Sequence, residues 1–241
     1  MVGCLLKYLK RFFRIGQLRW HWQLSGASYI HNNPAAIDLI KKVVRDFHID
    51  LVIDTGDITD FGTPVETSLI DGISKLPVPY VFVPGNHESP KTVAFMRGVK
   101  NVTVLDGKEV DIKGITVIGF ADPASANPRP ALIDDKAKAA LRAQIIGTLK
   151  PLPAGPLILA VHNPKAVNGL LGRVPIILVG HTHKADLIER DGFIENNAGT
   201  TGAAGLRTSL EVTGTQGEFR LERNLIKGKA ASKSELGMLS R

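Results

Sequence analysis

Two stretches of the chain share one design: DLVIDTGD at residues 50–57 and PVPYVFVPGNHE at residues 77–88. Each is a run of apolar residues, typical of a buried strand, that leads into a glycine turn and then into polar residues. Between them, residues 64–76 have the pattern of a helix. This alternation of strand, turn and helix predicts an α/β fold.

Predicted elements continue on both sides of these stretches. Upstream, Asn33 and Pro34 form a helix start, and apolar residues at helical spacing continue to Phe47. A third helix is expected over residues 134–149. Strands are expected at 24–30, 102–105, 109–112, 115–120, 155–162, 173–181, 185–190, 193–196, 207–213 and 217–223. The turns DG and KG between the strands near residue 110 suggest hairpins, so the sheet is predicted to be mixed.

The chain is long enough for one large domain, with 241 residues of which 44% are hydrophobic. We predict that this domain spans residues 23–223, after a basic amphipathic segment at 1–22 and before a basic tail at 224–241 that is expected to be disordered. The single cysteine excludes an intrachain disulfide and fits a reducing compartment. No apolar run approaches the roughly eighteen residues needed to cross a bilayer. We expect a cytoplasmic location, with a membrane-peripheral one as the alternative.

The net charge of +7 is concentrated at the two ends of the chain. Residues 1–37 contain five basic residues and no acid, and residues 224–241 contain four basic residues and one acid. The stretch between them is close to neutral, so we expect no basic groove and no nucleic-acid partner. Residues 1–16 place apolar and basic side chains on opposite halves of a helix. This pattern is typical of a helix packed on its own domain, of a leader-like segment, or of peripheral contact with a membrane surface.

Four of the predicted strands end in polar residues of similar chemistry. These residues are Asp57 and Asp60 in GDITD, Asn86 and His87 in GNHE, His162 in AVHN, and His181 and His183 in GHTH. Because loops at the carboxyl ends of strands in an α/β sheet converge on the ligand site, we expect these side chains to meet in space. Each residue by itself is more often structural than a ligand, but their joint placement has no structural explanation. His21 and His48 lie outside the pattern and are interpreted as structural.

Carboxylate, amide and imidazole groups without thiolates suit Mn, Fe or Zn and disfavour a structural zinc site. The carboxylate of Asp57 can bridge two ions, and the amide of Asn86 adds no charge, so the metal keeps its Lewis acidity. Two neighbouring ions can activate a water and stabilise the oxygens of an in-line phosphoryl displacement. His87 is then available to protonate a leaving alkoxide, and Asp60 is a candidate to orient its ring.

In this order, GDITD, GNHE, AVH and GHTH resemble the motifs of the calcineurin-like metallophosphoesterases, over roughly residues 24–223. The resemblance implies an α/β fold with four layers, a β-sandwich of mixed sheets flanked by helices. It implies that Asp57 bridges two metal ions, with Asn86, His162 and His181 completing one site and His183 joining the other. The implied cofactors are two divalent ions, with Mn preferred and Fe, Zn or Mg as alternatives. The implied activity is hydrolysis of a small phosphomonoester or phosphodiester, with His87 as proton donor or transition-state stabiliser.

The first motif of that family, Asp-x-His, falls on Tyr29-Ile30-His31 within SYIHNNPAAI. His31 therefore takes a ligand position, but a phenol with a pKa near 10 stands where the resemblance implies a carboxylate. Three accounts remain open. Tyr29 binds as a phenolate, or the second metal is weak and held by His31, Asp57, His183 and water, or the site is impaired. We favour the second account.

Two further features bear on substrate and activity. Phe61 follows the second aspartate of GDITD, where the phosphoprotein phosphatase branch of the family carries an arginine. Phosphoserine and phosphothreonine substrates are therefore disfavoured, and a small phosphodiester or nucleotide is preferred.

The alternative to an active enzyme is a catalytically weakened or silent family member that acts as a binding module. The argument for this alternative is Tyr29.

Overall fold

The computed structural model describes residues 14–15, 18–19, 24–28, 30–149, 157–191 and 193–201. Tyr29 lies outside these residues, as do most of the segment at 1–22, the strands predicted at 207–213 and 217–223, and the tail at 224–241. Near the N-terminus, Arg14–Ile15 (β1) and Leu18–Arg19 (β2) pair as a two-stranded antiparallel ribbon. No helix in the described part of the chain is long and apolar enough to cross a bilayer.

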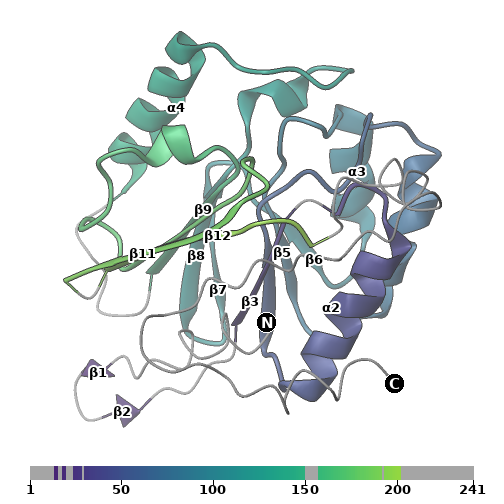
Figure 1. Ribbon diagram of the computed structural model, residues 1–241, viewed down its shortest axis with the longest axis horizontal. Helices are drawn as coiled ribbons and strands as arrows, with labels where there is room; N and C mark the ends of the chain where they lie inside the picture. The colour runs from purple at the N-terminus through teal and green to yellow at the C-terminus, as the bar shows by residue number, and fades with distance from the viewer. Residues whose placement is uncertain are drawn as a thin grey trace, which may run out of the picture.

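A four-stranded parallel sheet forms one half of the fold (Figure 1). Its strands, in spatial order, are β3 (Leu24–Ala27), β4 (Leu51–Asp54), β5 (Tyr80–Phe82) and β6 (Val102–Val104). β4 and β5 are buried along their whole length. A sheet covered on both faces calls for apolar runs rather than alternating patterns, which is why these two strands were clear in the sequence.

A six-stranded sheet forms the other half, in the order β11-β12-β10-β9-β8-β7. Its strands are β7 (Lys108–Ile112), β8 (Ile115–Phe120), β9 (Leu157–Val161), β10 (Ile176–Val179), β11 (Ala185–Arg190) and β12 (Phe193–Ala198). The four central strands are parallel, whereas the edge strands β7 and β11 run antiparallel to their neighbours. Of the two large sheets, only this one combines parallel and antiparallel pairing, as predicted for a mixed sheet.

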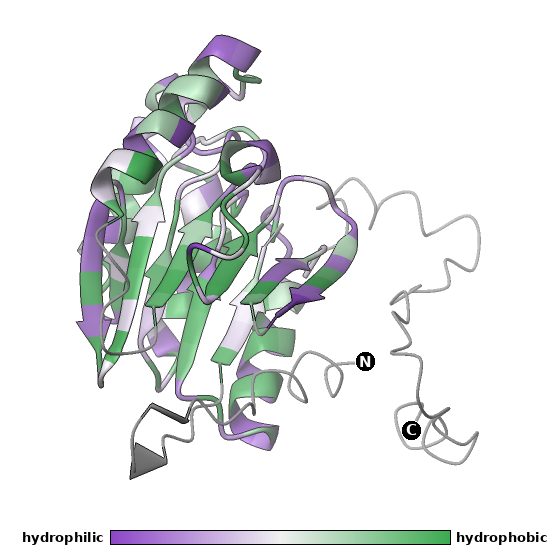
Figure 2. Cartoon of the chain, turned by 90° about the vertical axis from the view of Figure 1, so that its left-hand side faces the viewer, coloured by the Kyte–Doolittle hydropathy of each residue, from purple (hydrophilic) through white to green (hydrophobic). Residues whose placement is uncertain are grey.

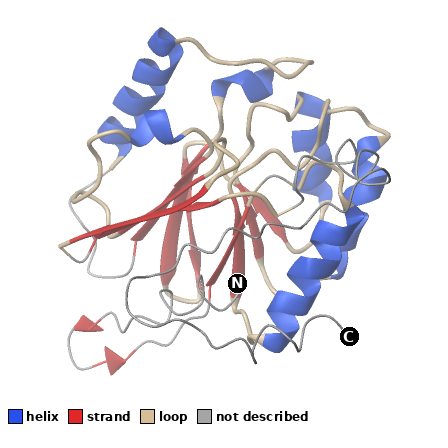
Figure 3. Cartoon of the chain, in the orientation of Figure 1, coloured by secondary structure: helices blue, strands red, loops and turns tan. Residues whose placement is uncertain are grey.

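Helices cover the outer face of each sheet, as Figure 3 shows. On the four-stranded sheet lie α2 (Pro34–Asp46), the 3-10 helix η1 (Glu66–Lys75) and α3 (Pro90–Gly98). On the six-stranded sheet lie α4 (Asp135–Thr148) and the short η3 (Pro164–Val167), while η2 (Pro123–Ala126) follows β8. The predicted α/β sandwich of two sheets flanked by helices is confirmed.

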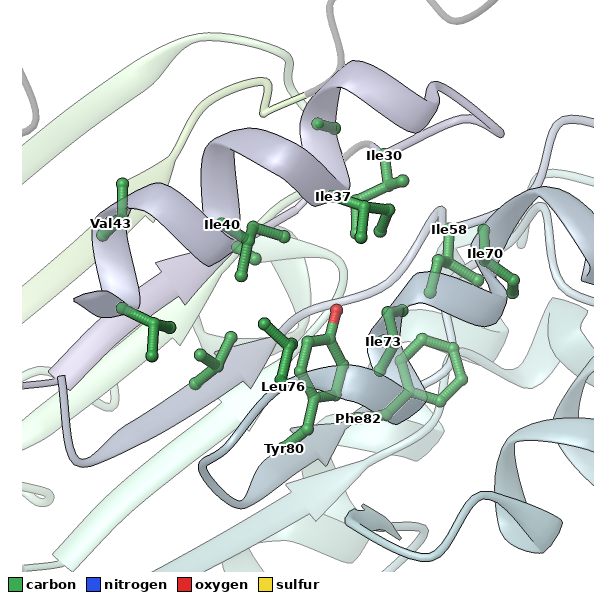
Figure 4. Packing of buried hydrophobic residues seen from close by; sticks show 14 of the residues in the cluster. Ile30, Ile37, Ile40, Val43, Ile58, Ile70, Ile73, Leu76, Tyr80 and Phe82 are labelled. Carbon is green, nitrogen blue, oxygen red and sulfur yellow. The ribbon is translucent and has the colours of Figure 1, made fainter. Parts of the chain in front are cut away.

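Apolar side chains fill the space between the sheets and under the helices. Several central strands are largely hydrophobic in Figure 2, and both sheets contribute to the core between them. Under α2, the side chains of Ile37 and Ile40 belong to one buried cluster with Ile73, Tyr80 and Phe82 (Figure 4). The burial of each such aliphatic side chain stabilises the fold by about 1.5–3 kcal/mol.

Two local predictions differ from the structure, a third is confirmed, and one helix was not predicted. The DG turn does not close a hairpin, because β6 pairs with β5 in one sheet and β7 pairs with β8 in the other. This turn instead carries the chain between sheets, with Gly107 at φ +72°. The KG turn does close the β7–β8 hairpin. The helix predicted at 64–76 is a 3-10 helix, and α3, capped by Ser89, was not predicted.

Candidate metal centre

The polar residues that follow the strands come together at the carboxyl ends of both sheets. Asp57 follows β4 and Asn86 follows β5, in the four-stranded sheet, while His162 follows β9 and His181 follows β10, in the six-stranded sheet. Asp57, Asn86 and His162 are buried, and His181 is half-buried. The predicted convergence is therefore present, and it brings together neighbouring strand ends from both sheets.

Three potential ligand atoms form a nearly equilateral triangle. Nε2 of His162 lies 2.9 Å from Oδ1 of Asn86 and 3.0 Å from Nδ1 of His181, and the last two atoms are 3.0 Å apart. Oδ2 of Asp57 lies 3.4 Å from Nε2 of His162. Ligand atoms at right angles around an ion, each about 2.1 Å from it, stand roughly 3 Å apart. These spacings fit one ion held by all four side chains.

The proton arrangement at this triangle also fits a cation. Nδ1 of His162 is 2.7 Å from the carbonyl oxygen of Thr55, so in the neutral ring Nδ1 carries the proton and Nε2 carries a lone pair. That lone pair faces the amide oxygen of Asn86 and Oδ2 of Asp57, a buried atom that accepts no hydrogen bond from the described residues. Lone pairs that converge in a buried site need a positive charge between them. A backbone carbonyl on the far ring nitrogen is also the usual support of a metal-binding histidine.

The pKa values of these groups reflect the same crowding. Burial is the largest influence on the pKa of Asp57 and raises it, but the charges of His162, His87 and His31 outweigh this effect and lower the pKa. Burial lowers the pKa of His162, yet the charges of Asp57 and Asp122 outweigh it and raise that pKa. Burial and the charge of His162 lower the pKa of His181 to about 4. The pKa values of His162 and His181 are thus shifted in opposite directions within one cluster.

A buried carboxylate that the sequence analysis did not single out holds the loop that carries Asp57. Asp57 lies in the left-handed region at φ +61°, which an aspartate adopts at some cost. Glu88, fully buried, accepts backbone N–H bonds from Asp57, Ile58 and Thr59 and from Gly85. The sequence contained an indication of this role. A tight loop leaves backbone N–H groups that need an acceptor, and the glutamate of GNHE can supply one.

Gly85 lets the two halves of the site approach each other. A side chain at this position would collide with Oδ1 of Asp57 and Nδ1 of His162. The backbone N–H of His87 donates to Oδ1 of Asp57 over 3.2 Å, which fixes the second oxygen of that carboxylate. The glycine turn is therefore a requirement of the site as well as of the strand that precedes it.

The GHTH turn is held by Asn197 of β12. Its amide nitrogen donates to the carbonyl of Gly180 over 2.8 Å and to the hydroxyl of Thr182 over 2.9 Å. His181 and His183 lie at φ +68° and +58°. Strained backbone persists where the surroundings impose it, often at a functional site. Asn197 supplies that restraint from a strand distant in sequence, so its role was not apparent from the sequence.

A second group of imidazoles lies beside the first. The ring of His31 packs edge-on against His87, with centroids 4.9 Å apart, and stacks with His183 at 5.8 Å. Nδ1 of His87 bonds to the backbone oxygen of Asp60 over 2.7 Å, whereas the Asp60 carboxylate lies 2.8 Å from Nδ1 of His31. The structure thus brings together all eight predicted site residues, but it joins the Asp60 side chain to His31 instead of His87.

Comparisons with known proteins identify the family of this chain. Residues 20–185 match the family described as calcineurin-like phosphoesterase. The crystal structure of TT1561 of Thermus thermophilus is similar, with a TM-score of 0.59 and 14% identity, over 74% of this chain and 89% of that chain. A dimetal phosphatase from Danio rerio has a TM-score of 0.49 and 11% identity, over 75% of this chain and 88% of that chain. No curated protein matches the chain at a significant level. Because the family match covers more than half of the sequence, the chain belongs to the calcineurin-like phosphoesterases, a family of metal-dependent phosphoric ester hydrolases.

Proposed function

We propose that this protein hydrolyses a small phosphomonoester or phosphodiester with a water activated between two divalent ions. Asn86, His162 and His181 would hold one ion, His31 and His183 the other, and Asp57 would bridge them. Mn is the preferred metal, with Fe, Zn or Mg as alternatives. When bound, the ions would supply the Lewis acidity that activates water and neutralises charge on the phosphoryl oxygens.

One observation carries this proposal: the convergence of electron-pair donors at the first ion position. The ligand atoms of His162, Asn86 and His181 are 2.9 to 3.0 Å apart. Asp57, His162 and His181 also form a group whose ligand atoms all lie within 4.8 Å of one another. A packed core has no use for this arrangement, because burying such groups without a partner is costly.

His87 would transfer the proton. This residue is half-buried, so part of it remains exposed to solvent. The carbonyl of Asp60 accepts from Nδ1 over 2.7 Å and fixes the ring. In the imidazolium form, Nε2 then carries the proton that can pass to the leaving oxygen or stabilise its charge. Asp60 would position His87 through its backbone rather than through its carboxylate.

The alternative is a weakened or silent family member that serves as a binding module. The observation in its favour is Tyr29, which replaces the carboxylate of the first motif. Against it stand His87 and the intact donor set of the first ion. The proposed substrate remains a small phosphodiester or nucleotide in a cytoplasmic setting, with no nucleic-acid partner and with peripheral membrane contact through residues 1–16 as an open alternative.

The test measures bound metal and hydrolysis on the same sample. The protein, stripped of metal and reloaded with Mn²⁺, would be assayed with aryl phosphomonoesters and phosphodiesters, beside Tyr29→Asp and beside His162→Ala as the inactive reference. Hydrolysis by the natural chain that His162→Ala abolishes supports the enzyme. Activity that arises only in Tyr29→Asp supports the silent relative, and none in any variant with metal bound would refute both phosphoesterase accounts.

A further inference from the structure

The first motif lacks its carboxylate, since Tyr29 takes the place of aspartate. We infer that Asp60 makes up for this loss from another loop, by acting through His31. Its carboxylate would fix the orientation and tautomer of the His31 ring, so that Nε2 becomes a ligand atom for the second ion. The inference rests on the proposed function, because it concerns the second ion of the same site.

The direct contact is short and mostly shielded from solvent. Nδ1 of His31 lies 2.8 Å from Oδ1 of Asp60, and the two side chains are 5% and 14% exposed. When Nδ1 donates its proton to the carboxylate, Nε2 of the neutral ring carries the lone pair. In many metalloproteins, a carboxylate accepts a hydrogen bond from a histidine whose other ring nitrogen binds the metal. The carboxylate also raises the basicity of that histidine. Asp60 is thus a positioning residue rather than a ligand.

Backbone hydrogen bonds hold His31 against the loop of Asp57. The N–H of His31 donates to the carbonyl of Asp57 over 3.1 Å, and the N–H of Asn32 donates to the carbonyl of Ile58 over 2.9 Å. His31 and Asn32 lie at φ +45° and +56°, in the left-handed region. Two successive residues in this region cost free energy that the surrounding contacts must offset. The placement of His31 is therefore imposed by the fold.

A buried glutamate fixes the other half of the pair. The carboxylate of Glu66 accepts from the N–H groups of Asp60 and Phe61, each over 3.0 Å. It also accepts from the side-chain amide of Asn32, the residue after His31. One carboxylate thereby ties the loop of Asp60 to the turn of His31. This cross-link gives the contact between them the rigidity that a metal site needs.

The charge balance supports the same role. Burial lowers the pKa of His31, and the charges of Asp57 and Asp60 act against this effect. In the family's first motif the aspartate contributes one negative charge beside the bridging aspartate, and tyrosine contributes none when protonated. Asp60 supplies a second negative charge next to His31, whose ring packs against those of His87 and His183. This charge would help to hold a second ion although Tyr29 replaces the aspartate of the first motif.

The test follows metal binding in the absence of substrate. Metal-free protein would be titrated with Mn²⁺ by calorimetry, and electron paramagnetic resonance would detect the magnetic coupling of two adjacent Mn²⁺ ions. Asp60→Asn keeps the size of the side chain and removes its charge. Asp38→Asn, on the exposed side of α2 with a 75% exposed carboxylate, is the matched control. We expect Asp60→Asn to weaken the second ion about 10–100-fold and to abolish the coupled signal, with the first ion and the control unchanged.

A double-mutant cycle tests whether Asp60 acts through His31. If it does, Asp60→Asn combined with His31→Gln weakens the second ion no more than His31→Gln alone. The inference is wrong if the effects add, if Asp60→Asn keeps both ions, if it weakens the first ion equally, or if the natural chain binds one ion only. Hydrolysis is assayed separately. A natural chain that binds two coupled ions without hydrolysing any ester would refute the proposed function and leave this inference intact.

Discussion

Replacing Glu88 with glutamine should destabilise the protein severely, although the two side chains have the same shape. Oε1 accepts from the N–H groups of Ile58 and Thr59 over 2.8 and 3.3 Å, and Oε2 accepts from those of Asp57 and Gly85 over 2.9 and 2.6 Å. A glutamine amide replaces one of these oxygens with an NH₂ group. Whichever way it turns, two backbone N–H groups then face another donor.

The magnitude follows from those two lost acceptors. A buried donor left without a partner costs about 1–3 kcal/mol, so Glu88→Gln should lower the free energy of unfolding by about 2–6 kcal/mol. Domains of this kind are stable by about 5–15 kcal/mol, so the loss is a large fraction of the total. Because the loop carries Asp57, we also expect weaker binding of Mn²⁺.

Urea unfolding of the metal-free protein measures the loss of stability without any contribution from bound metal. Glu109→Gln, which removes the same charge from an exposed position of β7, serves as the control and should change the free energy of unfolding by less than about 0.5 kcal/mol. A Glu88→Gln variant as stable as this control, with unchanged affinity for Mn²⁺, would show that the carboxylate does not hold the loop.

Three further outcomes are expected. Gly85→Ala should abolish binding of the first ion in a Mn²⁺ titration, because its methyl group collides with Asp57 and His162; binding with natural affinity would contradict the role of this glycine. The affinity for Mn²⁺ should fall up to tenfold per pH unit below the raised pKa of His162, because the ion displaces the proton of this residue. Calorimetry in buffers of different ionisation heat would measure the released proton. An affinity that does not change with pH would exclude this competition. Burial raises the pKa of Asp54 to about 7 despite its bond to Tyr80. The folded state therefore binds this proton more tightly than the unfolded state, so the stabilisation is present below about pH 4 and is lost as the pH rises to 7, by a few kcal/mol. Asp54→Asn should remove that part of the pH dependence of urea unfolding, and an unchanged profile would refute the assignment.

The elements built on local patterns were predictable from the sequence. Helix α2 has its cap at Asn33 and its apolar face in short-range order, and it forms as predicted. The strands that end near Asp57 and Asn86 are continuous apolar runs, and they too form as predicted. The partner of β6 was not predictable, because strand pairing depends on contacts between distant segments and not on the turn that follows.

In the site, too, local patterns were predictable from the sequence and long-range contacts were not. The sequence by itself determined which groups would meet, because polar residues after buried strands must gather where the strand ends converge. Only the tertiary structure decided that the carboxylate of Asp60 contacts His31 rather than His87, and that Glu88 and Asn197 hold the loops of the site. The partner of a side chain is fixed by packing between segments far apart in sequence, and a local pattern carries no record of that packing.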